Sequence, residues 1–438
     1  MMKYFDIETF GAVGDGKTIN TDAIQAAVDA ASEVFGTVVI PAGTFISGTI
    51  NLKNADLYLE NHAVLKGSPD IRDYPYIGYY HNEMKEVTSL LYAIGNNNIH
   101  VYGSGMIDFN GTSFYNITTP IIPDYYKTPL TKEQIAECNY AFDERVNQPF
   151  FFADCEKIVM DGISLNDASC WTLSFSHCKN IKLLNLNITA NQNLPNNDGM
   201  HFSCCQDVIV KGCNILTGDD CIALTCITDW EGICENFVIS DCILRSCSKA
   251  FVAGYMYSHV RNITLSNCII QDSNRGICIM SGAGVGLVEN VIINNVMIDT
   301  RVRVGNWWGN GEPIFLMGVQ HDNGILSFIA EQKPDKTTKY CIDNVFINNV
   351  VIHGENAMGI VGDGDSIRNV TLSNISFKTK ASKNLALKGR TLDTNPAPIF
   401  IDVPDDCFLK IHGADDVKLI NVTGDEAACV DKVDRRRA

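Results

Sequence analysis

A short motif of alternating apolar and polar residues recurs along most of the chain. Each copy opens with a polar residue, continues with residues of alternating polarity, and ends at an Asn, Asp or Gly corner before a second short apolar stretch. Copies begin at Asn98, Lys157, Asn180, Asp207, Asn236, Asn262, Asn290, Asn344, Asn369 and Asp416. Central copies lie roughly 23 to 29 residues apart, a spacing typical of repeat architectures.

Period-two alternation predicts short β-strands, and the corner residues predict how the strands are joined. Asn tolerates left-handed backbone at a bend, and stacked Asn side chains can hydrogen-bond from one coil to the next. We therefore predict an all-β fold, a single-stranded parallel β-helix. The alternative is a β-sandwich with regularly spaced strands. The polar corner kept in every copy and the near absence of hairpin turn dipeptides favour the β-helix.

The repeats run without a linker or low-complexity break, so we predict a single domain over residues 1–438. Its parts are an N-terminal cap over about 1–50 and coils over about 51–425. Two segments break the rhythm, 111–148 and 300–340, and we expect them to be long loops that form walls of a functional site.

An Ala-rich segment before the repeats predicts a helix from about Asp22 to Val34. Asn20 and Thr21 precede it as capping residues, and Gly36 ends it. Such a helix would cover the open end of the solenoid, which otherwise exposes its core.

Composition narrows the possible partners. The formal net charge is -17, which argues against nucleic acid or an anionic membrane surface as a partner, because both need basic patches. No apolar run approaches the length of a transmembrane helix. The 17 Cys residues form no CxxC pair and recur at core-like positions, so we expect reduced, buried thiols and no zinc site. With no leader-like pattern in Met1–Phe10, these thiols predict a cytoplasmic protein.

Two acidic clusters stand out from the corner residues. Asp198 lies in Asn196–Gly199, and Asp219 and Asp220 follow Gly218. Because the clusters are about one repeat apart, we expect them to be stacked neighbours on one face. Three converging carboxyl groups repel, so at least one keeps its proton to higher pH and leaves an acid beside a base. Glycoside cleavage uses this pair: an acid protonates the leaving oxygen, and in an inverting reaction a carboxylate activates water.

The sequence resembles glycoside hydrolase family 28, which contains the polygalacturonases and rhamnogalacturonan hydrolases. The resemblance rests on Phe10–Gly16, on Asn196–Asp198 (Asn where the family has Thr in the middle), on Asp219–Asp220, and on the repeats as far as about Asn421. It is greater to bacterial members than to fungal ones. It implies a right-handed parallel β-helix and hydrolysis with inversion. It also implies that Asp219 is the general acid and that Asp198 and Asp220 activate the water.

Two departures concern the basic residues that hold a galacturonate carboxylate in polygalacturonases. The family's Gly-His-Gly element should fall within residues 247–255, which contain no His. Its Arg-x-Lys element falls at Arg275, but Ile277 occupies the Lys position. A galacturonide, a related uronide and a neutral sugar therefore all stay open as the group at the cleavage site.

Further residues near the acids are candidates for substrate binding. Aromatic faces stack on sugar rings, and polar side chains one or two coils from the acids can reach a bound sugar. Each also has a structural alternative: a surface Arg, a corner His, or a Trp that fills a loop core. The candidates are Asn196, His201, Lys249, Arg275, Trp307, Trp308 and Glu312. We expect Trp171 to pack locally instead.

These observations predict an inverting glycoside hydrolase that acts on pectin-derived oligosaccharides from the chain end, with no cofactor and no metal. One alternative is a β-elimination lyase, in which the acids would hold Ca²⁺ and a Lys or Arg would be the base. The other is a non-catalytic carbohydrate-binding solenoid.

Overall fold

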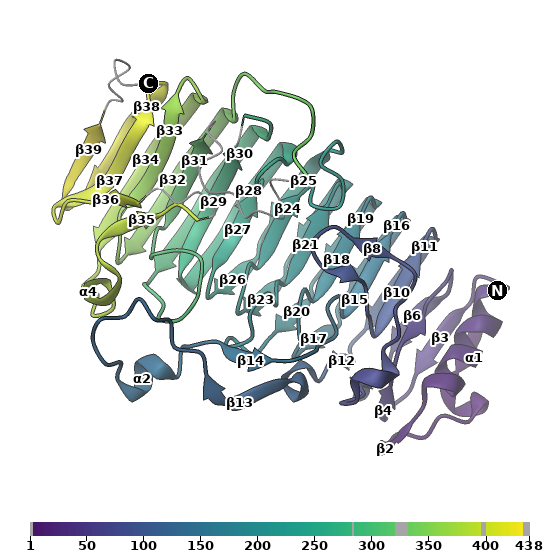
Figure 1. Cartoon of the computed structure of the whole chain (residues 1–438). Coiled ribbons are helices and arrows are strands. Elements are labelled where there is room, and N and C mark those ends of the chain that lie inside the picture. The colour runs from purple at the N-terminus through teal and green to yellow at the C-terminus, as the bar shows by residue number, and fades with distance from the viewer. Residues whose placement is uncertain (1–2, 283, 320–331, 396–399, 432–438) are drawn as a thin grey trace.

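The computed structural model describes residues 3–282, 284–319, 332–395 and 400–431, which form stacked coils of parallel strands (Figure 1). One face of the described coils is a twelve-stranded sheet, which we call the front sheet. Its strands, all parallel, are β5 (Ile50–Asn51), β10 (Leu91–Ile94), β15 (Phe150–Ala153), β18 (Leu173–Ser176), β21 (Met200–Ser203), β24 (Ile222–Thr225), β27 (Lys249–Ala253), β29 (Arg275–Gly282), β31 (Ile314–Val319), β33 (Met358–Gly364), β37 (Cys407–Ala414) and β39 (Ala427–Asp431).

A larger sheet of 21 described strands forms the rest of each coil. In the N-terminal half each coil gives it two short strands: β1 (Tyr4–Asp6), β2 (Asp15–Ile19), β3 (Thr37–Ile40), β4 (Gly43–Ser47), β6 (Asp56–Leu59), β7 (Ala63–Gly67), β11 (Asn97–Gly103), β12 (Met106–Asp108), β16 (Glu156–Asp161), β17 (Ser164–Asn166), β19 (Lys179–Leu184), β20 (Asn187–Thr189), β22 (Gln206–Lys211), β23 (Asn214–Thr217), β25 (Cys234–Ser240) and β26 (Ile243–Ser246). Later coils give it one long bent strand each: β28 (His259–Ser273), β30 (Leu287–Thr300), β32 (Ile342–Gly354), β34 (Ile367–Thr379) and β38 (Val417–Gly424).

The bends lie at the predicted polar corners. Asn267, Asn295, Asn349 and Asn374 all have left-handed backbone, with φ between 50° and 57°. The first three form a ladder in which Asn295 Nδ2 donates to Asn267 Oδ1 at 3.2 Å and Asn349 Nδ2 donates to Asn295 Oδ1 at 2.6 Å. Asn374 Nδ2 donates instead to Asn348 Oδ1 at 2.9 Å. The ladder keeps successive coils in register, because each amide both donates and accepts.

The interior is filled by the inward-facing residues of both sheets. Phe152, Phe175 and Phe202 stack in line, with ring centroids 5.2 Å and 5.0 Å apart. All 17 cysteines are free thiols and 16 of them are buried. They occupy the interior as small, weakly polar residues, as predicted.

The N-terminal helix forms, but with different limits. Helix α1 (Thr21–Ser32) packs Ile24, Ala27, Val28 and Ala31 against the first coils, and Ala26 is exposed. The coils also begin before residue 51, since β1 pairs with β3 and β2 pairs with β4. The first strands are therefore part of the solenoid, and helix α1 packs over its end.

The two expected long loops contain regular elements. Segment 111–148 folds into the short helices η3 (Gly111–Phe114) and α2 (Lys132–Ile135) and an antiparallel hairpin of β13 (Tyr115–Pro120) and β14 (Tyr140–Phe142). The prediction that 300–340 is a single loop is wrong, because β31 lies inside this segment and pairs with β29 in the front sheet. Part of that segment, 320–331, lies outside the described residues.

Two further insertions between coils were not predicted, because nothing in the repeat pattern of the sequence indicates them. The β8–β9 hairpin consists of β8 (Tyr80–His81) and β9 (Lys85–Glu86). A later insertion contains α4 (Leu385–Lys388) and the antiparallel pair β35 (Thr391–Asp393) and β36 (Phe400–Asp402). Both precede a strand of the front sheet, as segment 111–148 does. In Figure 1, β13, β14, α2 and α4 lie at the edge where those strands begin, whereas β8 lies over the sheet near β18 and β21. The short helices η1 (Ile7–Phe10) and η2 (Ile71–Asp73) complete the described elements.

Among the described residues, the helices are all too short or too polar to span a bilayer.

The corner ladder makes a prediction about stability. Replacing Asn295 with Ala should lower the free energy of unfolding by about 1–2 kcal/mol, because a side chain with no amide loses two hydrogen bonds and disfavours left-handed backbone. Asn295→Gly should cost less, because Gly adopts this backbone freely. Urea denaturation measures both. Met297→Ala, at an exposed position of the same strand, is the control and should change stability by no more than about 0.5 kcal/mol. Equal losses in the Ala and Gly variants would show that backbone conformation contributes nothing.

Candidate active site

Four charged residues follow one another across neighbouring strands of the front sheet, at or just before the start of each strand. Gly199 N donates to the carbonyl of Asp220 at 2.8 Å, and Cys221 N donates to that of Lys249 at 2.9 Å. Lys249 is paired with Arg275 in the next step of the ladder. With Met200 opposite Ile222, this register places Asp198 beside Asp220. The prediction that the two acidic clusters are stacked neighbours is therefore confirmed.

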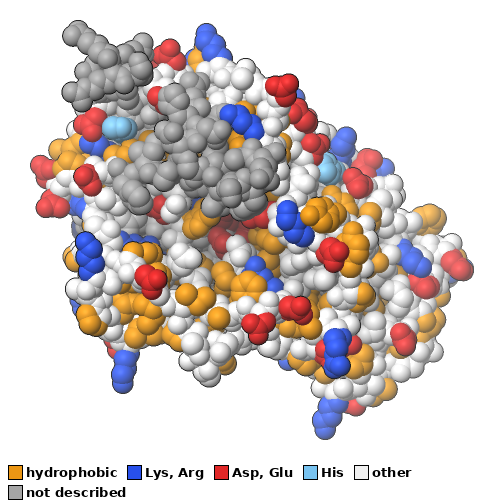
Figure 2. Space-filling model, in the orientation of Figure 1, with side chains coloured by type: hydrophobic (Ala, Val, Ile, Leu, Met, Phe, Trp, Pro, Cys, Tyr) orange, Lys and Arg blue, Asp and Glu red, His pale blue; other side chains and the backbone are white. Residues whose placement is uncertain are grey.

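A pocket of about 210 Å³ lies over the first three residues of this row, Asp198, Asp220 and Lys249. Figure 2 shows acidic and basic side chains at the bottom of a recess near the middle of this face. Eight of the ten predicted site residues line the pocket: Asn196, Asp198, His201, Asp219, Asp220, Lys249, Trp307 and Trp308. Other lining residues include Glu83, Trp171 and Tyr255.

Asp219 is held at the pocket by a turn that Asn197 fixes. The buried side chain of Asn197 accepts hydrogen bonds from Gly218 N at 2.7 Å and Asp219 N at 3.0 Å, and donates to the carbonyl of Asn191 at 2.7 Å. Asn197 thus joins the two acidic clusters directly. Its role was missed, although the sequence pattern around Asp198 includes it.

Two of the three acids have strongly raised pKa values. Burial raises the pKa of Asp219 well above its ordinary value, and the carboxylates of Asp220 and Asp198 add to the effect. Burial also raises the pKa of Asp198, with Asp220 as the next cause. The cluster therefore retains a proton at pH values where an exposed Asp has lost it, as predicted from the convergence of three carboxyl groups.

Asp220 is the acid that carries a counter-ion. Lys249 Nζ lies 3.1 Å from Asp220 Oδ1 and 3.3 Å from Oδ2, and the backbone N of Lys249 donates to the same carboxylate at 3.1 Å. The Lys249 side chain is 4% exposed. Burial lowers the pKa of its amine, but Asp220 and Asp219 outweigh burial and raise it above the ordinary value. Lys249 is therefore an ammonium group held in place against the carboxylate of Asp220.

Asp198 is oriented by a column of stacked rings. Its Oδ2 lies 2.7 Å from His201 Nδ1, and His201 Nε2 lies 3.1 Å from Thr225 Oγ1. The His201 ring stacks on Trp171 at 3.6 Å, and Trp171 meets His81 edge-on at 5.3 Å. Burial lowers the pKa of His201 to about 3, so the ring is neutral. His201 is thus not a corner residue: it lines the pocket from within β21, and both of its nitrogens bond to protein atoms.

Trp171 was expected to pack locally, but it lines the pocket as the central ring of this column. The sequence pattern could not predict this contact, because the column joins residues of two different coils and of the β8–β9 hairpin.

The opposite wall of the pocket is aromatic. Trp308 stacks on Tyr255 with ring centroids 5.9 Å apart, and its ring lies 4.9 Å from Lys249 Nζ. Trp307 is nearly buried and donates from Nε1 to the carbonyl of Glu137 at 3.0 Å. This bond ties the wall to segment 111–148. On the other side, Asn196 Oδ1 accepts from Arg145 of the same segment at 2.9 Å.

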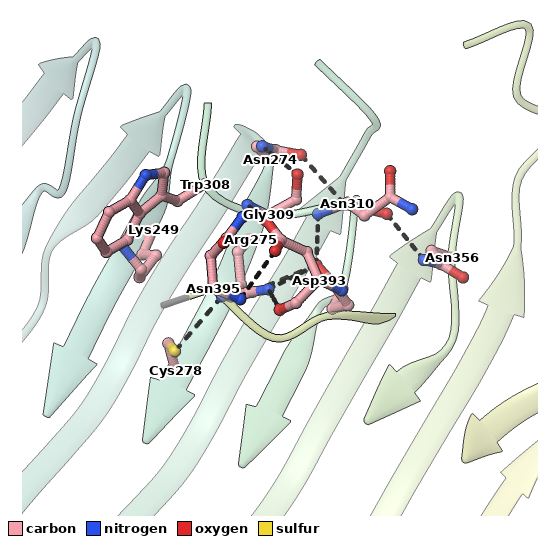
Figure 3. Close-up of polar contacts among 12 residues, drawn as sticks. Lys249, Asn274, Arg275, Cys278, Trp308, Gly309, Asn310, Asn356, Asp393 and Asn395 are labelled. Atoms are coloured by element: carbon pink, nitrogen blue, oxygen red, sulfur yellow. Dashed lines mark hydrogen bonds and ion pairs between the residues drawn. The ribbon is translucent and has the colours of Figure 1, made fainter. Parts of the chain in front are cut away.

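Arg275 and Glu312 do not belong to the pocket, which corrects their prediction as substrate-binding residues. Both side chains are 0% exposed, and Arg275 Nη2 lies 3.2 Å from Glu312 Oε2. Figure 3 shows the Arg275 guanidinium enclosed under Gly309 and Asn310 and against Asp393, whose carbonyl accepts from Nη2 at 2.6 Å. Ile277, at the position of the family's Lys, is a core residue. The insertion that contains Asp393 covers the Arg, and no repeat signal in the sequence revealed it.

The Arg275–Glu312 pair instead fixes the loop that carries the two Trp residues. Glu312 accepts from Asn310 N and from Asp393 N, each at 2.7 Å. Asp393 in turn accepts from Gly309 N at 2.5 Å. The pair is therefore a support beneath the aromatic wall.

A fourth carboxylate, Glu83, reaches the pocket from the β8–β9 hairpin. Burial raises its pKa to about 7, with the charge of Asp219 as the second cause. Sequence reasoning missed it, since nothing in residues 80–86 indicates where the hairpin lies.

Within the described residues, no group of three or more His, Cys, Asp or Glu side chains is arranged to hold a metal ion.

Comparison with known proteins identifies the family. A sequence model described as Glycosyl hydrolases family 28 matches residues 31–302. A probable polygalacturonase of Vitis vinifera is 25% identical over 379 residues, covering 77% of this chain and 73% of that protein. An exo-poly-alpha-D-galacturonosidase of Dickeya chrysanthemi is 26% identical over 377 residues, covering 78% of this chain and 58% of that longer protein.

Solved structures confirm the right-handed parallel β-helix. A family 28 exopolygalacturonase of Yersinia enterocolitica superposes with a TM-score of 0.65 at 20% identity, covering 98% of this chain and 79% of the other. An exopolygalacturonase of Thermotoga maritima gives a TM-score of 0.63 at 17% identity, covering 95% and 92%. At these identities the likeness concerns the fold alone.

The buried Arg275–Glu312 pair predicts a large effect on stability. Glu312→Gln should lower the free energy of unfolding by about 3–5 kcal/mol, because it leaves the buried Arg275 without its counter-charge. Urea denaturation measures the change. Glu231→Gln, at an exposed ion pair with Lys336, is the control and should change stability by less than about 1 kcal/mol. An unchanged stability in Glu312→Gln would contradict the supporting role of the pair.

Proposed function

Because this chain belongs to family 28 of the glycosyl hydrolases, we propose that it is an inverting glycosidase that removes sugars from the ends of pectin-derived oligosaccharides. The observation that carries the proposal is the pocket in which Asp219, with its raised pKa, lies beside Asp198 and Asp220. A protonated acid and carboxylates in one pocket are what this hydrolysis needs.

The proposed roles follow from the environment of each acid. Asp219 donates its proton to the glycosidic oxygen, because burial and its two acidic neighbours keep it protonated. Asp220, paired with the ammonium of Lys249, is the carboxylate that accepts a proton from the attacking water. Asp198, held by His201, helps to orient that water. Trp308 and Tyr255 offer aromatic faces to the sugar ring.

Action from the chain end is supported by the insertions around the pocket. The β8–β9 hairpin lies on one side and the Trp307–Trp308 wall on the other, and both are anchored to other elements. A site enclosed in this way admits a chain end more readily than the middle of a polymer. The names of the Dickeya, Yersinia and Thermotoga relatives also describe enzymes that act from chain ends. We propose a galacturonide or a related uronide as the sugar, with Lys249 as the cation nearest to it.

A β-elimination lyase fits the site less well. A lyase of the kind considered needs a neutral Lys or Arg as its base, but the acids raise the pKa of Lys249 and the guanidinium of Arg275 is enclosed. Burial of the thiols, many of which donate to backbone carbonyls in the core, supports our further proposal that the protein works in a reducing compartment, the cytoplasm.

Asp219→Asn tests the proposed acid. Activity on defined pectic oligosaccharides should fall by about 10²–10⁴-fold, because the amide cannot donate a catalytic proton. Release of reducing sugar measures the loss, and the anomeric configuration of the first product, followed by NMR in the wild-type protein, tests inversion. Asp207→Asn, the same substitution at an exposed corner outside the pocket, should leave activity unchanged. Full activity in Asp219→Asn would remove the assigned role.

The raised pKa of Asp219 also predicts the shape of the pH profile. The acid form is the active one, so activity should persist well above the ordinary pKa of 3.8 and fall as pH rises through the raised value. A profile of kcat/KM against pH measures this alkaline fall. Loss of activity already at pH 4 to 5, typical of an unperturbed Asp, would contradict the assignment of the proton to this cluster.

A further inference from the structure

Glu83 is a carboxylate without a partner inside the pocket. Its side chain is half-buried and, within the described residues, makes no hydrogen bond or ion pair. By contrast, Asp198 is bonded to His201 and Asp220 to Lys249. Shielding a carboxyl group from water without a hydrogen bond is unfavourable, so such a group in a pocket indicates a ligand that supplies the missing contact.

The backbone around Glu83 is rigidly placed. His81 Nδ1 accepts hydrogen bonds from Glu83 N at 3.1 Å and from Met84 N at 3.0 Å. Burial lowers the pKa of His81 to about 3, which keeps this nitrogen an acceptor. Its ring rests on Trp171, in the same column that ends at His201 and Asp198. The turn that carries Glu83 and the carboxyl group of Asp198 are thus positioned by one column of rings.

The tip of the hairpin is fixed at the far edge of the front sheet. The hairpin leaves the chain before β10, at the edge where the strands begin. Asn82 Nδ2 nevertheless donates to the carbonyls of Ile227 and Thr228, which follow β24, at 2.9 Å each. Asn147 holds the base of the hairpin through the carbonyl of Glu86 at 2.8 Å. Figure 1 shows the hairpin lying over the strands around β18 and β21. It therefore crosses the outer face of the sheet beside the pocket and carries Glu83 to it.

We propose that Glu83 is a specificity-determining residue that binds hydroxyl groups of the terminal sugar, the sugar that hydrolysis releases. A carboxyl group accepts hydrogen bonds from neighbouring hydroxyls, and the hairpin limits the pocket on that side, so the sugar that meets Glu83 is the last of its chain. Because its pKa is raised to about 7, the Glu83 side chain is protonated below about pH 7. In that form it also donates a hydrogen bond and does not repel a uronate. This inference rests on the proposed glycosidase function.

The test compares Glu83→Ala and Glu83→Gln with Glu86→Gln, an exposed acid on the same hairpin, on the oligosaccharide that the wild-type protein cleaves best. Glu83→Ala should raise KM at least about tenfold while kcat changes less than about threefold, because hydrogen bonds to a charged group are lost. The inhibition constant of the released monosaccharide should rise by a similar factor. Glu83→Gln, which keeps one acceptor oxygen, should show a smaller rise. Glu86→Gln should match the wild type.

Other results would contradict either the role of Glu83 or the proposed glycosidase function. If Glu83→Ala and Glu83→Gln match Glu86→Gln, the role of Glu83 is wrong while the glycosidase function stands. If kcat falls and the inhibition constant of the monosaccharide is unchanged, Glu83 does not bind the terminal sugar. If Glu83→Ala does not fold, the Gln variant and the inhibition constant decide. If the wild-type protein cleaves no pectic oligosaccharide, the proposed function itself fails.

Discussion

The in-register stacking of parallel coils is the constraint on which the site depends. In a parallel ladder each residue lies about 4.8 Å from its partner on the next strand, so one position repeated over successive coils becomes a row of adjacent side chains. Asp198, Asp220, Lys249 and Arg275 form such a row. The Asn corners maintain the register by bonding amide to amide along the solenoid. A slip of one residue would turn these side chains toward the core.

Charges of both signs are buried along this row, and each is compensated differently. Lys249 neutralises Asp220, and Glu312 neutralises Arg275. Burial raises the pKa values of Asp219 and Asp198, and the charge of Asp220 raises them further. The same low-dielectric surroundings thus yield a fixed carboxylate and a retained proton within one pocket, a separation of roles that acid–base catalysis uses.

The insertions form the walls of the pocket, which a solenoid of regular coils would not have. Segment 111–148, the Trp307–Trp308 loop and the insertion containing Asp393 bond to one another through Glu137, Gly309 and Glu312. The β8–β9 hairpin is anchored separately, at Ile227 and Thr228. Because the three acids lie on regular coils, such insertions offer a physical way to change what reaches them without altering the coils.

The sequence by itself determined the coil fold, the corner residues and the three acids, because each follows from local pattern: strand alternation, left-handed Asn, and a spacing of one repeat. It also indicated Lys249 and Trp308 as neighbours of the acids. Only the tertiary structure decided that Arg275 is enclosed rather than available to a sugar, because its partner Glu312 and its cover Asp393 come from segments 37 and 118 residues further along the chain. Likewise, Glu83 and Trp171 reach the pocket through an insertion and a stack of rings across coils. Such contacts depend on where a segment outside the repeat comes to lie, and the repeat pattern carries no information about that.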